Sequence, residues 1–113
     1  MDVNAGKLNR RIQLLRATET ENDVGEMIPA WHNLGAPIFA RRRDVSDAER
    51  MQAGAWDNLL VVRFVVRATV FARDIRRTDR LEHEGVTYRI DGIKEVPPGR
   101  AFLEITAITG EVL

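Results

Sequence analysis

The sequence contains no cysteine, which excludes disulfides and thiolate metal sites. Serine occurs once, at Ser46, and histidine twice, at His32 and His83, so catalytic triads and metal sites have few candidate residues. Aromatic residues make up only 6% of the chain, which leaves few side chains on which nucleic-acid bases can stack. The longest apolar run, around residues 59–66, is far shorter than the roughly 20 residues of a membrane-spanning helix. The sequence therefore predicts a protein that works in a reducing compartment or is indifferent to redox conditions, and that does not span a membrane.

Length and composition favour a folded globular protein. Hydrophobic residues make up 44% of the 113-residue chain and charged residues 30%, as in ordinary soluble domains. A chain of this length is sufficient for one core, so we expect a single domain over residues 1–113. The first residues, MDVNAGKLNRR, lack the apolar segment of a secretory signal, and we expect a cytoplasmic protein.

The net charge is zero, but the charges are unevenly distributed. Residues 38–80 carry ten basic and six acidic side chains, a local excess of +4, whereas residues 81–113 carry three and six. All basic residues except Lys7 and Lys94 are arginine. Arginine binds carboxylates and phosphates through a planar fork, so this bias favours ion pairs at interfaces. A GC-rich genome is an equally good explanation of the bias.

Most of the chain reads as short strands separated by turns. Alternating or apolar runs predict strands at 8–16, 27–34, 38–43, 59–67, 80–83, 86–93 and 101–108. The polar stretch 19–26 has the composition of a hairpin loop, and Pro29 makes the next strand an edge strand. Gly85 and the Pro97-Pro98-Gly99 run mark further turns. We predict a mostly β fold, a small antiparallel β-barrel or sandwich with one long loop that carries a short helix.

The long loop is the connection at about 44–58. Ser46 and Glu49 have the spacing of a helix capping box, in which each side chain binds a free backbone N–H of the first turn. Gly54 then ends the predicted one or two helical turns. Connections of this length in a small β domain are often functional.

The clearest strand, Leu59–Arg67, has an unusual second face. Its even positions, Leu60 to Val66, are all apolar and are expected to face the core. Its odd positions mix apolar and cationic side chains, whereas a solvated face is normally polar. We therefore expect another subunit to cover this face. The candidate interface residues are Val61, Arg63, Val65 and Arg67, together with Arg41, Arg43, Arg76 and Arg77.

No arrangement of residues points to catalysis, and we predict that the protein is not an enzyme and has no cofactor. Ser46 already has a structural explanation as a helix cap, and the two histidines lack the spacing of a metal site. The carboxylates mostly stand beside arginines, as in surface ion pairs. Dedicated nucleic-acid binding is disfavoured by a pI of about 6.7, although arginines such as Arg41–Arg43 are able to contact phosphates.

Taken in order, several short segments resemble the phage head-tail joining proteins, which include the stopper and head-completion proteins of siphophage necks. The family's opening strand is similar to Gly6–Ile12, its D-x-G-G…W hairpin to Asp23–Trp31, and its S-G-x-E…A segment to Glu49–Gly54. Its final hairpin is similar to Asp79–Ile93. Phe39 stands where the family usually has tryptophan. The resemblance covers nearly the whole chain.

The resemblance implies a β-barrel that works as one copy of a ring, dodecameric in known necks, between portal or adaptor proteins and the tail. Double-stranded DNA would cross the lumen without sequence recognition, and the protein would pass from the bacterial cytoplasm into a virion or phage-like particle. The long loop would gate the lumen through Ser46, Glu49, Arg50, Gln52 and Trp56. The resemblance does not distinguish a phage from a prophage or a gene transfer agent. It also does not distinguish the roles of stopper, adaptor and tail terminator. The alternative is a stand-alone β-barrel module that binds nucleic acid or protein.

Overall fold

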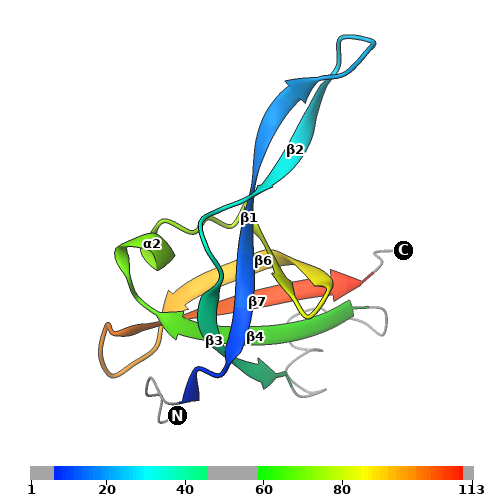
Figure 1. Ribbon diagram of the computed structural model, residues 1–113. Coiled ribbons are helices and arrows are strands. Elements are labelled where there is room, and N and C mark those ends of the chain that lie inside the picture. The colour runs from blue at the N-terminus through cyan, green and yellow to red at the C-terminus, as the bar shows by residue number, and fades with distance from the viewer. Residues whose placement is uncertain (1–6, 46–58, 111–113) are drawn as a thin grey trace.

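The computed structural model describes residues 7–45 and 59–110, which form a mostly β fold (Figure 1). Seven antiparallel strands make one sheet, and a short helix, α2 (Val70–Arg73), lies between the fourth and fifth strands. The strands are β1 (Arg10–Glu21), β2 (Met27–Asn33), β3 (Ile38–Asp44), β4 (Leu59–Arg67), β5 (Arg80–His83), β6 (Val86–Glu95) and β7 (Phe102–Gly110). The predicted fold class is confirmed.

The sheet closes on itself through β1. The strand order is β2-β1-β3-β4-β7-β6-β5, and β1 also pairs with β5. Residues 10–12 of β1 pair with β3, and residues 13–15 pair with β5. Six strands therefore surround the core as a small barrel, and β2 is the one strand of the described sheet that lies outside this ring.

The core follows the period of two that strands impose on their side chains. Ile12 and Leu14 of β1 are buried, and so are Val62, Phe64 and Val66 of β4. The other strands add buried side chains to the same cluster: Ala40, Leu81, Tyr88, Ile90, Leu103, Ile105 and Ala107. Leu60 departs from the predicted pattern, because it is 41% exposed.

The turn between β5 and β6 has the geometry that its two residues favour. His83 pairs with Val86, so Glu84 and Gly85 form a two-residue loop. Both have positive φ, 50° for Glu84 and 80° for Gly85. Such turns match the twist of the flanking strands, and glycine adopts positive φ without a steric cost. The turn predicted at Gly85 is confirmed.

The helix in the described part of the chain is not the predicted one. The helix expected after Ser46 falls among residues 46–58, outside the described residues. Helix α2 begins at Thr69, whose hydroxyl accepts a hydrogen bond from the Ala72 N–H at 3.1 Å. Ala72 and Ile75 are buried in the core cluster, so α2 covers one opening of the barrel. The threonine cap is the sequence signal that was missed.

A two-stranded arm projects from the barrel (Figure 1). Beyond Leu15, β1 pairs only with β2, in a ladder from Leu15–Asn33 to Glu21–Met27. We call residues 16–32 the arm. The predicted loop over 19–26 is too long, because β1 continues to Glu21. Thr18 and Thr20 favour the strand, and cross-strand pairing outweighs the polar composition of this stretch.

Arg16 binds the base of the arm to the barrel. Its Nε and Nη2 donate hydrogen bonds to the two carboxylate oxygens of Asp79, both at 2.9 Å. Its Nη2 also donates to the Asp74 carbonyl at 2.9 Å. The Asp79 carboxylate is buried and accepts a third bond from the Arg76 N–H at 2.8 Å. Burial raises the pKa of Asp79, but these hydrogen bonds lower it by a larger amount. The pKa of Asp79 therefore lies below the ordinary 3.8.

Replacing Arg16 by methionine leaves the buried Asp79 charge without its main partner. We expect Arg16→Met to lower the free energy of unfolding by about 3 kcal/mol, measured by urea denaturation. Arg10→Met is the matched control, because Arg10 pairs with Glu84 at 3.0 Å on the exposed surface. That loss should cost under about 1 kcal/mol. Equal effects of the two variants would contradict the role of Arg16.

His83 is a buried imidazole on the core side of β5. Its ring packs edge-on against Phe64, with the centroids 5.2 Å apart. Arg42 Nη1 lies 3.4 Å from His83 Nδ1, and because arginine only donates, this contact requires a neutral ring with Nδ1 as acceptor. Burial lowers the pKa of His83 below 6.5, the nearby Arg42 and Arg10 add to this effect, and Glu84 opposes it. The folded protein therefore holds the neutral form.

This pKa shift makes stability depend on pH. The unfolded chain binds the His83 proton near pH 6.5, whereas the folded protein binds it only at lower pH. Stability is therefore complete above pH 6.5 and falls below it, by up to about 1.4 kcal/mol per pH unit until the folded pKa is reached. We expect His83→Leu to remove most of this dependence between pH 7 and 5, measured by denaturation midpoints. His32→Leu, at an exposed position, should retain it. The same pH dependence in both variants would contradict this assignment.

Candidate interaction site

The outer surface of the barrel carries a row of arginines on β3 and β4. Arg41 and Arg43 lie on β3, and Arg63 and Arg67 lie on β4, all at odd positions that alternate with core residues. Arg43 is directly opposite Arg63 in the β3–β4 ladder. We call these four residues the arginine face. The register of the β3–β4 ladder places these four candidate interface residues on one face of the sheet.

Glu104 of β7 offsets the repulsion within this face. Its buried carboxylate lies 3.6 Å from Lys94 Nζ, 3.7 Å from Arg63 Nη1 and 3.9 Å from Arg43 Nη2. Like charges directly opposite in a ladder are destabilising, so a carboxylate between Arg43 and Arg63 is needed to hold both. Three cations around one anion leave the face cationic.

Val61 and Val65 are already buried within the single chain, contrary to the prediction that a neighbouring subunit covers them. Val61 is 1% exposed and Val65 is 0% exposed within the chain itself. Val61 packs in a second apolar cluster with Val45 and Ile108, outside the barrel core. Val65 lies between Arg41 and Glu104 in the ladders. Long arginine side chains cover apolar surface with their stems, so the chain buries both faces of this strand without a partner.

The remaining predicted site residues do not join this face. Arg76 and Arg77 are exposed in the turn between α2 and β5, where the Arg76 N–H binds Asp79. The candidate gate residues Ser46, Glu49, Arg50, Gln52 and Trp56 all fall outside the described residues.

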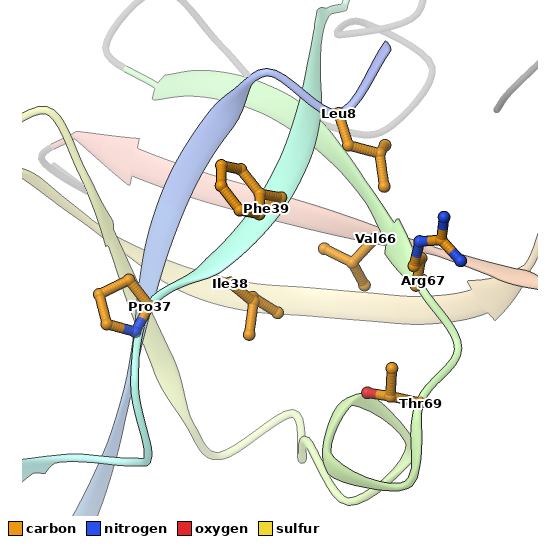
Figure 2. Close-up of a pocket in the computed structure, with 7 residues that line it drawn as sticks. All are labelled: Leu8, Pro37, Ile38, Phe39, Val66, Arg67 and Thr69. Atoms are coloured by element: carbon orange, nitrogen blue, oxygen red, sulfur yellow. The ribbon is translucent and has the colours of Figure 1, made fainter. Parts of the chain in front are cut away.

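An apolar groove lies beside the start of β3 (Figure 2). Its volume is about 570 Å³, and it is lined by Leu8, Pro37, Ile38, Phe39, Val66, Arg67 and Thr69. Phe39 is 54% exposed, although it is a large apolar side chain. The Arg11 guanidinium lies 4.9 Å from the centre of the Phe39 ring, a cation–π contact. The groove has no signal in the sequence, because its walls come from three segments that only the fold brings together.

The arm ends in a second exposed apolar patch. Val24 is 77% exposed, Met27 58% and Ile28 41%. The Asn22 side-chain oxygen closes the turn at the tip, where it accepts hydrogen bonds from the N–H groups of Val24 at 3.0 Å and Glu26 at 2.9 Å. Large exposed apolar side chains gathered on a projection indicate a binding surface. Val24 falls in the predicted loop over 19–26, whereas Met27 and Ile28 fall in the predicted strand 27–34, and neither prediction indicated an exposed apolar patch.

The described residues give little support to other kinds of site. Among residues 7–45 and 59–110, no three His, Asp or Glu side chains come together as a metal site. No helix in the described part of the chain has both the length and the apolar character to span a membrane. The arrangement instead offers surfaces: a cationic sheet face, an apolar groove and a projecting arm. A closed barrel with such surfaces has the features of a protein class that contacts other macromolecules.

Comparisons with known proteins agree with this class. The family model described as "Phage head completion protein" matches residues 3–110, and the chain belongs to this family. It is thus a structural protein of the phage virion class. No curated protein matches the chain.

Two solved structures are similar over nearly their whole length. One is protein SF1141 from Shigella flexneri 2a, with 27% sequence identity and a TM-score of 0.68 over 93% of this chain and 95% of that one. The other is a chain in the virion of a native gene transfer agent particle, with 26% identity and a TM-score of 0.66 over 94% of this chain and 97% of that one.

The burial of Val61 provides a test of the two-sided core. We expect Val61→Asp to lower the free energy of unfolding by at least about 3 kcal/mol, because it places a carboxylate in an apolar cluster. Val70→Asp is the control, since Val70 is 91% exposed and its replacement should change stability by less than about 0.5 kcal/mol. Urea denaturation of both variants gives the comparison. A folded, fully stable Val61→Asp protein would restore the original prediction that only a neighbour covers this position.

Proposed function

We propose that this chain is a neck protein, which joins the DNA-filled head of a tailed phage or phage-like particle to the tail. In this proposal it acts as one copy of a ring, dodecameric as the family resemblance implies, around the DNA channel. The observation that carries the proposal is the family match over residues 3–110. The similarity to a chain in a gene transfer agent virion supports it, because the likeness covers both chains almost completely.

The surfaces of the chain suit a ring protomer. Neighbours in a ring make head-to-tail contacts, and each copy therefore needs two different patches. The chain carries a basic surface on β3 and β4 and an acidic arm, which are different and complementary. Portal or adaptor proteins on one side and tail proteins on the other are the further partners in this proposal.

Gating of the channel is the most detailed part of the proposal, and it rests on the family resemblance alone. Its candidate residues belong to the connection at 44–58, nearly all of which lies outside the described residues. Assembly in the bacterial cytoplasm before incorporation into the particle is likewise part of the proposal.

The arginine face keeps one alternative worth testing, a stand-alone module that binds nucleic acid. Arg41, Arg43, Arg63 and Arg67 lie on one surface, where they are able to contact phosphates. Such a module would bind short duplex DNA as a monomer, and its affinity would fall steeply as salt is raised. A neck protein has no need for such affinity, because the DNA has to slide past it.

Deleting the gene from the phage or phage-derived element that carries it tests the proposal. We expect DNA-filled heads and separate tails in the lysate, counted by electron microscopy, because the joining protein is missing. Expression of the intact chain from a plasmid should restore tailed particles. Normal numbers of tailed particles without this chain would overturn the proposal, and salt-sensitive DNA binding by the monomer would then favour the alternative.

A further inference from the structure

The arm has little to hold it within its own chain. From Arg16 to Glu21, β1 pairs only with β2, so this part is a ribbon of two strands roughly 20 Å long. A two-stranded hairpin without a third strand or a helix against it is marginally stable in water. Its tip nevertheless has an ordered turn, with Gly25 at a φ of 83°. A projection with a hydrogen-bonded turn and exposed apolar side chains is suited to insertion into another surface, which would also stabilise it.

The charges of the arm restrict its partner. Residues 17–31 include Glu19, Glu21, Asp23 and Glu26 and no lysine or arginine. Phosphates repel such a segment, which argues against contact with the DNA backbone. The complementary surface should be apolar at its centre and cationic at its rim.

The groove beside Phe39 has these properties. Its lining is apolar apart from Thr69 and Arg67 (Figure 2). The exposed Arg67 side chain makes no ion pair or hydrogen bond with the other described residues, and Arg11 lies above the Phe39 ring. Two cations therefore stand at a groove whose centre is an exposed aromatic side chain.

The arm cannot reach the groove of its own chain. Figure 1 shows the arm leaving the barrel in the direction opposite to the N-terminal end of the described chain, where Leu8 lines the groove. Because the arm points away from the groove of its own chain, it is placed to meet the groove of a different copy, which is a head-to-tail contact. Both halves of the match are encoded in this sequence, and this favours a second copy over an unrelated protein.

We propose that the arm tip of each copy, with Val24, Met27 and Ile28, inserts into the Phe39 groove of the next copy, while the arm carboxylates face Arg11 and Arg67. This inference rests on the proposed ring and specifies the contact that builds it. Burial of apolar side chains supplies affinity, and the charges set the direction and register of the contact.

Disulfide trapping tests the contact directly, because the chain has no native cysteine. Particles are made with the double variant Val24→Cys/Phe39→Cys, oxidised, and run on a non-reducing gel. We expect a ladder of covalent multimers up to the full ring. Val24→Cys/Thr87→Cys is the matched control, because Thr87 lies on β6 at an exposed position away from the groove. This control should give at most dimers.

Each outcome has a distinct meaning. If the double variant enters particles but gives no more multimers than the control, the arm-to-groove contact is wrong while the neck role stands. If the wild-type chain is absent from the particles, the neck role itself fails. If Phe39→Cys disturbs folding, Pro37→Cys places the thiol in the same groove.

Charge reversal gives an independent measurement. Arg11→Glu/Arg67→Glu on the rim and Glu21→Arg/Glu26→Arg on the arm should each lower the yield of tailed particles by at least about tenfold, with unchanged melting of the purified monomer. The chain that carries all four changes should recover much of this yield, because the pairing is then restored with opposite signs. Full yield from either pair alone, or no recovery in the combined variant, would overturn the contact.

Discussion

The fold depends on strand β1, which takes part in three separate ladders. Its first residues pair with β3, its middle residues with β5 and its last residues with β2. The first two ladders close the barrel, and Ile12 and Leu14 fill its core from this seam. The third carries the strand out of the barrel as the arm. One strand thus links the stability of the barrel to the position of the projection.

An ion pair stabilises the junction between the barrel and the arm. Arg16 is the first residue of β1 beyond the closing ladder, and its fork binds Asp79 just before β5. Asp79 is buried and also accepts a backbone N–H, so the pair is positioned from both sides. The angle at which the arm leaves the barrel therefore depends on a side-chain contact and not on the sheet alone. Trp31 adds to this junction, because the Arg80 guanidinium lies 4.2 Å from the centre of its ring.

The charge distribution of the sequence becomes meaningful in three dimensions. The basic middle of the chain forms the arginine face and contributes Arg67 to the groove, whereas the acidic residues before it form the arm. The chain therefore carries a basic surface and an acidic projection, although its net charge is zero. In the proposed ring, contacts between surfaces of opposite sign would pair these charges between neighbouring copies.

The sequence by itself determined the strands, because apolar residues at every second position form one apolar face only in a β-strand. It predicted β2, β3, β4 and β5 closely, and the turn at Gly85. Only the tertiary structure decided what lies against each face. Val61 and Val65 are buried by the chain itself, since their cover comes from neighbouring strands that are distant in sequence. The arm and the groove could not be predicted from local composition either. Strand pairing leaves the β1–β2 hairpin without a third strand, and closure of the sheet brings Leu8, Phe39 and Val66 together.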